Sequence, residues 1–184
     1  MSNNTISLQS ILSVEQKEEI RDWIYHNPGI HYAMKYLSSE CQIQITDDPD
    51  LIKGFERDCS NIPGNIEMLC RPTNEKECAI ILTYCQSAKI LLTIAAGRTN
   101  LNGSATPEGG MVMSMEKMTQ PEPLLDMNTQ CISAPVGIYL EDMRKAALQQ
   151  SQNKLHFPVD PTSRKEAMIG GVVSCNASGF VPGP

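Results

Sequence analysis

The residues best suited to chemistry lie in one short stretch, residues 94–105. It contains two glycines and five side chains that can donate hydrogen bonds, which are Arg98, Thr99, Asn100, Asn102 and Ser104. Glycine lets the backbone turn with positive φ and lets another group approach closely. Successive N–H groups in such a turn can form a concave nest for an anion. Because the apolar run over residues 90–94 indicates a buried strand leading into it, the stretch is a candidate phosphate-binding loop.

Neither of the common phosphate-binding motifs is present. A P-loop needs the pattern G-x-x-x-x-G-K-[ST], but Gly97 and Gly103 are one residue too far apart and no lysine follows them directly. The G-x-G-x-x-G pattern of dinucleotide-binding folds occurs nowhere in the chain. Loops rich in Gly, Asn and Ser are also common as plain turns. The loop chemistry alone therefore leaves a phosphate site and an ordinary turn both open.

Length and charge limit the classes of protein to consider. The 184 residues, of which 41% are hydrophobic, suit one medium domain or two small ones. With a formal net charge of -6 and no run of Lys or Arg, we expect binding to neither nucleic acid nor anionic membranes. No apolar run approaches the ~20 residues that span a bilayer, and the polar N-terminus lacks the pattern of a signal peptide.

Cysteine and histidine usage bears on metal binding and on the cellular compartment. The chain has seven cysteines, none spaced as C-x-x-C, and three histidines. This pattern gives little support to a metal site, and we expect none. An odd number of scattered cysteines in a chain without a leader is typical of reduced thiols. We therefore predict a cytoplasmic protein.

Residues 1–40 are predicted to be helical. Ser13 and Gln16 have the spacing of a capping box, which starts a helix by satisfying its first N–H groups. Pro28 and the glycine after it should end this helix. Residues 31–37 then predict a second helix.

A strand–helix–strand pattern follows the helical region. A short strand over 42–46 and an acidic loop at 47–50 come before it. Residues 66–70 and 90–94 predict strands, and Thr73 is the predicted N-cap of the helix between them. This unit favours a parallel pair of strands joined by a right-handed crossover. The candidate loop would follow the second strand, at the carboxyl end where α/β sheets bind ligands.

The last third of the chain alternates regular and irregular segments. Strands are predicted over 111–115 and 128–134. Residues 155–164 are polar and irregular, and 167–179 are rich in small residues. A helix between these parts has apolar residues along one side, which are Leu140, Met143, Ala147 and Leu148.

Five segments occur in the order found in a known family. From about residue 55 to its end, the chain resembles the FAD-binding domain of the vanillyl-alcohol oxidase / p-cresol methylhydroxylase (PCMH-type) superfamily. It is most similar to the branch that contains D-lactate dehydrogenase and glycolate oxidase. The segments are the helix start Arg71-Pro72-Thr73-Asn74-Glu75, the loop at 97–103, Pro107 to Gly110, Asp160 to Ser163, and Ile169 to Gly179.

The resemblance implies FAD as cofactor and names the residues that contact it. In the family the glycine-rich loop holds the FAD pyrophosphate, which implies Gly97, Arg98, Thr99, Asn100, Leu101, Asn102 and Gly103. The two later segments line the pyrophosphate, ribose and isoalloxazine, which implies Pro161, Thr162, Ser163, Gly170, Gly171, Ser174, Asn176, Ala177 and Gly179. Two alternatives stay open: Arg98 could instead be a solvated surface arginine, and the small residues could serve close packing.

The resemblance also implies the α+β fold class. We expect an incomplete PCMH-type FAD-binding fold whose βαβ unit carries the pyrophosphate loop, preceded by an N-terminal helical segment. The expected domains are residues 1–50, helical, and residues 51–184, FAD-binding and ending before the family's domain is complete. The turn Pro135-Val136-Gly137 replaces the family's P-G-V. Because no histidine lies between residues 32 and 155 to attach the flavin, we expect non-covalent FAD.

The implied function is that of the N-terminal part of a flavin-dependent oxidoreductase. Such enzymes oxidise a 2-hydroxy acid, D-lactate or glycolate in this branch, by hydride transfer to the flavin. No catalytic residue is assigned, and His156, the nearest candidate base, is expected to pack beside a strand. A partner chain or a C-terminal half would complete the domain and the substrate site. The alternative is a non-catalytic interaction or assembly subunit, or an inactive fragment, since an incomplete domain leaves sheet edges and apolar surface uncovered.

Overall fold

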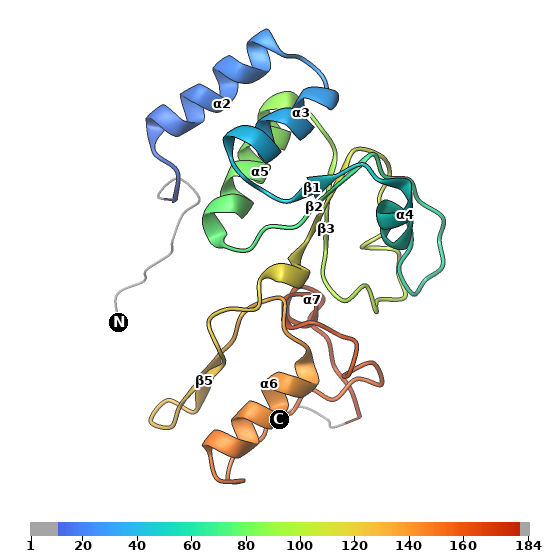
Figure 1. The fold of residues 1–184 in the computed structure, drawn as a ribbon. Coiled ribbons are helices and arrows are strands. Elements are labelled where there is room, and N and C mark those ends of the chain that lie inside the picture. Colours follow the sequence, from blue (N-terminus) through green and yellow to red (C-terminus); the bar gives the residue numbers. More distant parts are fainter. Residues whose placement is uncertain (1–10, 181–184) are drawn as a thin grey trace. The chain divides into compact units, whose positions relative to one another are not determined.

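The structure is a computed structural model that describes residues 11–180, which fall into two units (Figure 1). Within the described residues, unit 1 comprises 11–57, 63–94 and 106–114. Unit 2 comprises 58–62, 95–105 and 115–180. The expected domain boundary between residues 50 and 51 stays a prediction.

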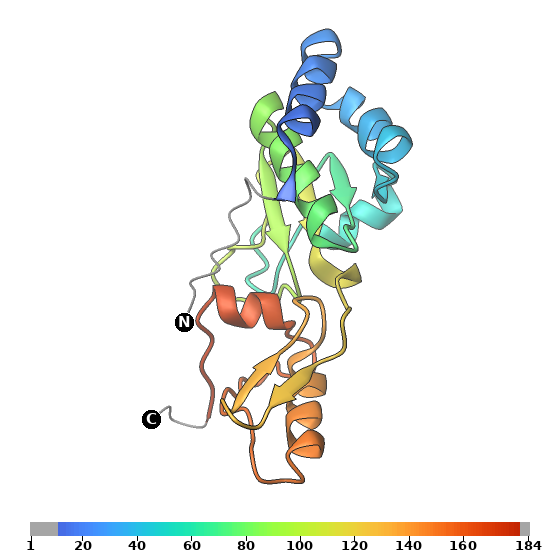
Figure 2. The same ribbon diagram turned by 90° about the vertical axis from the view of Figure 1, so that its left-hand side faces the viewer.

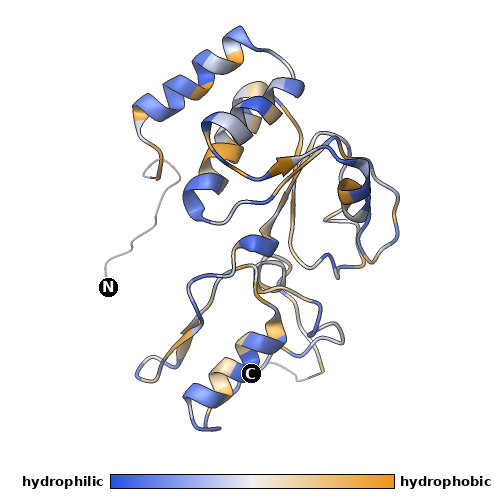
Figure 3. Ribbon diagram, in the orientation of Figure 1, coloured by the Kyte–Doolittle hydropathy of each residue, from blue (hydrophilic) through white to orange (hydrophobic). Residues whose placement is uncertain are grey.

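Helix α2 (Val14–His26) begins at the predicted capping box. The Gln16 N–H donates to Ser13 Oγ at 3.2 Å, and the Ser13 N–H donates to Gln16 Oε1 at 3.0 Å. This confirms the helix start predicted from the sequence. Most of α2 is hydrophilic (Figure 3), and Ile20 is its buried residue. The chain then forms α3 (His31–Lys35) and a π-helical turn, η1 (Tyr36–Glu40).

The predicted acidic loop contains a short helix. Asp48 caps it by accepting a hydrogen bond from the Asp50 N–H at 2.9 Å, and Pro49 occupies its first position. Proline suits that position because the first N–H groups of a helix have no partner within the helix. The elements formed are α4 (Pro49–Ile52) and the 3-10 turn η2 (Lys53–Phe55).

Four strands form one sheet, in the spatial order β1-β2-β4-β3. Their bounds are β1 Ile45–Thr46, β2 Met68–Cys70, β3 Leu92–Ala95 and β4 Met111–Ser114. β2 pairs antiparallel with β1 and parallel with β4. The two strands of the predicted pair, β2 and β3, are not neighbours in the sheet, because β4 lies between them. All four β4 residues are buried, and a central place in the sheet provides backbone partners on both edges of such a strand.

Helix α5 (Glu75–Ala88) connects β2 and β3, and its N-cap is Asn74, not the predicted Thr73. The side chain of Asn74 accepts a hydrogen bond from the Glu77 N–H at 3.0 Å. The Thr73 hydroxyl instead donates to the Glu77 carboxylate. Both residue types can cap a helix, so backbone conformation and not residue type decided between these neighbours.

Unit 2 packs its helices around an apolar cluster. Its elements are η3 (Met115–Lys117), the hairpin strands β5 (Leu124–Asp126) and β6 (Cys131–Ser133), α6 (Leu140–Gln150) and α7 (Ile169–Ser174). The hairpin is visible in Figure 2 as two adjacent arrows. The buried residues of the cluster are Leu140, Met143, Ala167, Ile169 and Val172. Leu148, which belongs to the apolar side predicted for this helix, is 37% exposed.

None of the helices within residues 11–180 is long and apolar enough to span a membrane.

Replacing Asn74 with alanine removes the acceptor that caps α5. We expect the free energy of unfolding to fall by about 1 kcal/mol, measured by urea unfolding followed with far-ultraviolet circular dichroism. Asn74→Ser keeps an oxygen in the same place and should retain most of the wild-type stability. An equal loss in both variants would contradict the assignment of Asn74 as the cap.

Candidate functional site

All of the residues named for cofactor binding belong to unit 2. They come from three segments: the loop at 97–103, the irregular segment at 161–163, and the small-residue segment at 170–179. The loop contacts residues 166–168 through Gly97, and the small-residue segment contacts Asp160 and Pro161 through Gly179.

The base of the loop lies against the chain just before α7. A Cβ atom on Gly97 would overlap the main-chain oxygen of Glu166 and would come within 3.0 Å of the Met168 nitrogen. A Cβ on Gly171, by contrast, would lie 3.4 Å from the Ala96 Cβ, an ordinary van der Waals contact. The close approach of two main chains thus requires glycine at position 97 but not at position 171.

Arg98 occupies the left-handed region, with φ of 53°. This conformation is uncommon for residues other than glycine. The side chain is half-buried, and the Cys59 N–H donates to the Arg98 main-chain oxygen at 3.0 Å. Burial lowers the pKa of the Arg98 guanidinium, while Glu116 and Cys59 act in the opposite direction. Since arginine stays charged at neutral pH, the loop carries a half-buried positive charge instead of a fully solvated one.

The amide group of Asn100 is engaged within the protein. Its nitrogen Nδ2 donates to Asp58 Oδ2 at 2.5 Å and to Asn102 Oδ1 at 3.0 Å. The same Asn102 oxygen accepts from the Ser104 N–H at 3.2 Å. Both protons of the Asn100 amide are therefore used in shaping the loop. Main-chain N–H groups of the loop are therefore better candidates than the Asn100 amide for donors to an anion.

Asp58 is a residue that the sequence analysis missed. It is 7% exposed and accepts hydrogen bonds from the loop residues Asn100 and Ala105. Asp58 Oδ1 also accepts from the Ser60 N–H at 2.9 Å. Aspartate side chains often form this kind of turn with the N–H two residues later, so the sequence held a local signal for the turn. Its pairing with residues more than 40 positions later had no sequence signal.

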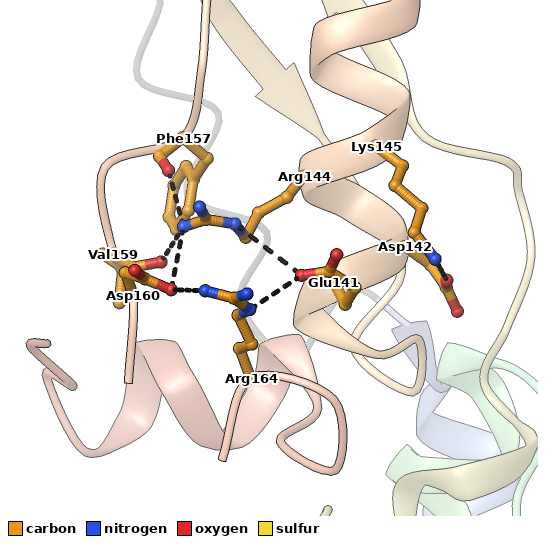
Figure 4. Close-up of polar contacts among 8 residues, drawn as sticks. All are labelled: Glu141, Asp142, Arg144, Lys145, Phe157, Val159, Asp160 and Arg164. Carbon is orange, nitrogen blue, oxygen red and sulfur yellow. Dashed lines mark hydrogen bonds and ion pairs between the residues drawn. The ribbon is translucent and has the colours of Figure 1, made fainter. Parts of the chain in front are cut away.

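Arg144 on α6 holds the segment that precedes Pro161 (Figure 4). Its nitrogen Nη1 donates to the main-chain oxygens of Phe157 at 3.1 Å and Val159 at 2.6 Å. The same nitrogen lies 3.7 Å from Asp160 Oδ1. One guanidinium group thus fixes an irregular stretch that has no regular hydrogen-bond ladder of its own.

Arg164 and Glu141 complete this charged cluster. Arg164 Nη1 donates to Asp160 Oδ1 at 2.6 Å, and its Nε lies 3.3 Å from Glu141 Oε2. The hydrogen bond from Arg164 lowers the pKa of the Asp160 carboxyl, so Asp160 is ionised at neutral pH. The two arginines balance the two carboxylates, and the cluster adds no net charge beside the segment at 161–163.

The segment at 170–179 contacts the turn at 135–137 and the chain at 160–161. The Gly170 N–H donates to the Val136 main-chain oxygen at 2.9 Å, which joins α7 to the Pro135-Val136-Gly137 turn. A Cβ on Gly179 would overlap the main chain of Asp160 and come within 2.6 Å of the Pro161 nitrogen. The small residues at positions 170 and 179 therefore permit close packing, which was the open alternative for this segment.

Several candidate side chains lie at the surface. Leu101 is 80% exposed. The other exposed members of the predicted set are Asn102, Thr162, Ser174, Asn176 and Gly179. His156 is exposed as well, so the expectation that it packs beside a strand is wrong. Within residues 11–180 there is no group of three or more His, Cys, Asp or Glu residues that could hold a metal ion.

Curated proteins with related sequences are oxidoreductases by name. The chain is 32% identical over 113 residues to D-lactate dehydrogenase of Archaeoglobus fulgidus, covering 61% of this chain and 24% of that protein. It is also 32% identical over 112 residues to glycolate oxidase subunit GlcD of Bacillus subtilis, covering 59% and 23%. The chain thus spans about a quarter of the length of the curated relatives that it matches.

Solved structures and family profiles agree on the fold. A crystal structure of alkyldihydroxyacetonephosphate synthase superposes with a TM-score of 0.63 at 18% identity, covering 74% of this chain and 28% of that one. At this identity the likeness concerns the fold alone, which is the PCMH-type FAD-binding fold. The profile of the family described as FAD binding domain matches residues 66–182, more than half of the chain. The chain therefore belongs to the FAD binding domain family, and its cofactor is FAD.

Proposed function

We propose that the loop at 97–103 binds the pyrophosphate of a non-covalently held FAD. The observation that carries the proposal is the close contact at the base of the loop, where Gly97 allows the main chain to lie on residues 166–168. The other residues proposed to line the cofactor are Pro161, Thr162, Ser163, Gly170, Gly171, Ser174, Asn176, Ala177 and Gly179.

The residues present fit an anionic cofactor. A pyrophosphate needs N–H donors and a positive charge, and main-chain N–H groups in a turn with positive φ can supply the donors. Positive φ occurs at Arg98 and Gly103, and the half-buried Arg98 supplies a charge close to the loop main chain. An arginine can donate charge-assisted hydrogen bonds to phosphate oxygens. The charges in the cluster around Asp160 balance, so the cluster adds no net repulsion toward an anionic cofactor.

The whole protein's reaction is proposed to be the oxidation of a 2-hydroxy acid of the D-lactate or glycolate type. This rests on the names of the relatives, of which the chain spans about a quarter. Bound FAD supplies the hydride-accepting chemistry. The residues of this chain bind and orient the cofactor, while further polypeptide is proposed to supply the substrate site. No residue of this chain is assigned a catalytic role.

A cytoplasmic location is part of the proposal. All seven cysteines lie within the described residues and are free thiols, the state that a reducing compartment maintains.

A non-catalytic assembly subunit is the second candidate. It is favoured by the exposed apolar side chains on and beside the edge strand β3, where Leu91 is 63% and Ile94 is 53% exposed. Exposed sheet edges of this kind attract partners. FAD binding with a defined stoichiometry would favour the first candidate, and a stable complex without flavin would favour the second.

The proposal predicts that the chain retains flavin. Purified protein incubated with FAD should show the flavin absorption bands after gel filtration, and denaturation should release all of the flavin because it is held without a covalent bond. A mixture of FAD with serum albumin serves as the control for carry-over. A chain that stays colourless at every FAD concentration, while folded by circular dichroism, would contradict cofactor binding by these residues.

Gly97→Ala and Gly54→Ala form a matched pair. The added methyl group at position 97 meets main chain on two sides, so we expect FAD affinity to fall at least tenfold. At position 54, in the η2 turn and outside the proposed site, the methyl group meets no atom within 4 Å, so FAD affinity should stay within about twofold. Titration of flavin fluorescence measures both. Equal affinities for the two variants would contradict the role of the loop base.

Arg144→Met and Lys145→Met form a second pair on α6. Arg144 holds two main-chain oxygens before Pro161, and loss of hydrogen bonds from a charged group costs about 1.5–3 kcal/mol. We therefore expect weaker FAD binding in Arg144→Met. Lys145 makes an exposed ion pair with Asp142 at 3.6 Å, so its loss should change little. A larger effect from Lys145 than from Arg144 would be evidence against the predicted difference.

A further inference from the structure

The carboxylate of Asp58 is buried at the foot of the loop, although Asp58 precedes the segment that matches the family. Asp58 is 7% exposed, and the family match begins at residue 66. Buried carboxylates are costly unless hydrogen bonds satisfy their oxygens. The partners of Asp58 therefore show what its charge is used for.

The two oxygens of Asp58 have separate partners. Oδ1 accepts from the Ser60 N–H at 2.9 Å, which closes the local turn. Oδ2 accepts from Asn100 Nδ2 at 2.5 Å and from the Ala105 N–H at 3.2 Å. One oxygen thus joins the middle of the loop to its end, and the same carboxylate joins both to the segment at 58–62.

The hydrogen bonds continue through the loop. Asn100 donates its second proton to Asn102 Oδ1, which also accepts from the Ser104 N–H. A series of bonds therefore runs from the buried charge through Asn100 and Asn102 to Ser104. Because each donor is used once, the series determines which way both amide groups point.

The segment at 58–62 also contacts the loop at two further points. The Cys59 N–H donates to the Arg98 main-chain oxygen at 3.0 Å. A Cβ on Gly103 would lie 2.9 Å from Ile62 Cδ1. The turn that Asp58 closes therefore lies along the loop from its start to its end.

An ionised carboxyl group is required at position 58. Burial acts to raise its pKa, but the hydrogen bonds from Ser60, Asn100 and Ala105 outweigh burial and lower the pKa to about 2. The group is thus ionised at neutral pH and accepts hydrogen bonds on both oxygens. An asparagine there would replace one acceptor oxygen with an NH₂ group and would leave donors facing donors.

We infer that Asp58 is a positioning residue for the FAD pyrophosphate, which holds the loop in its binding conformation without contacting the cofactor. The inference rests on the proposed function of the loop. It extends the cofactor site to a residue outside the matched family segment. Asp58 acts through Asn100 and Ala105 and so orients the main-chain N–H groups that lie between them.

The test compares Asp58→Asn with Asp126→Asn. Asp126 also accepts from the N–H two residues later, Asn128, at 2.8 Å, but it lies exposed in the β5–β6 hairpin of the same unit. We expect the dissociation constant for FAD to rise about tenfold or more in Asp58→Asn and to stay unchanged in Asp126→Asn. Titration of flavin fluorescence at neutral pH and fixed salt measures both constants.

A second measurement separates positioning from general stability. Amide hydrogen exchange in Asp58→Asn should be faster for residues 98–105 and unchanged for α6, and saturating FAD should restore the protection of the loop. Faster exchange throughout unit 2 would overturn the inference, since it indicates a purely structural role. Asn100→Ala, which removes one donor but leaves the carboxylate in place, should produce a smaller effect that is not additive with Asp58→Asn.

The outcomes distinguish this inference from the proposed function. If the wild-type chain binds FAD and Asp58→Asn binds it with the same affinity, the positioning role is overturned and the proposed function is left intact. Failure of the wild-type chain to bind FAD would count against the proposed function. In that case the exchange rates of residues 98–105 still decide whether Asp58 orders the loop.

Discussion

The steric constraint at Gly97 is the condition on which the rest of the site depends. Two main chains meet there with no room for a Cβ atom, so the loop after β3 can lie directly on residues 166–168. This contact brings together segments that are about 70 residues apart in the sequence. The loop would have to rise away from the chain before α7 if residue 97 carried a side chain. The segments that follow would then lose their position beside it.

Charged groups hold the irregular parts of unit 2 in place. The segments at 58–62, 97–105 and 157–164 contain little regular secondary structure, so their main-chain groups need partners from elsewhere. Asp58 accepts hydrogen bonds from the loop, and Arg144 donates to main-chain oxygens of the segment before Pro161. The buried Asp58 carboxylate and the half-buried Arg144 guanidinium therefore supply hydrogen-bond partners to these loops, as neighbouring strands do in a sheet.

Two loop side chains that the sequence suggested as donors to an anion are used within the protein instead. Asn100 and Asn102 have the chemistry to donate to a phosphate, yet their amide groups are bonded to each other, to Asp58 and to the Ser104 N–H. Their side chains therefore fix the shape of the loop by hydrogen bonds within the protein. Arg98 at positive φ fits the same picture, since neighbouring contacts hold it where glycine is usually found.

Local interactions were determined by the sequence itself. The capping box at Ser13, the helix break at Pro28 and the glycine-rich loop depend on residues within a few positions of each other, so residue type and spacing suffice to predict them. The order of the five family segments likewise identified the FAD-binding fold. Tertiary structure alone decided the rest. The insertion of β4 between β2 and β3 and the pairing of Asp58 with Asn100 satisfy buried backbone and buried charge across more than 40 residues, and no local pattern records such partners.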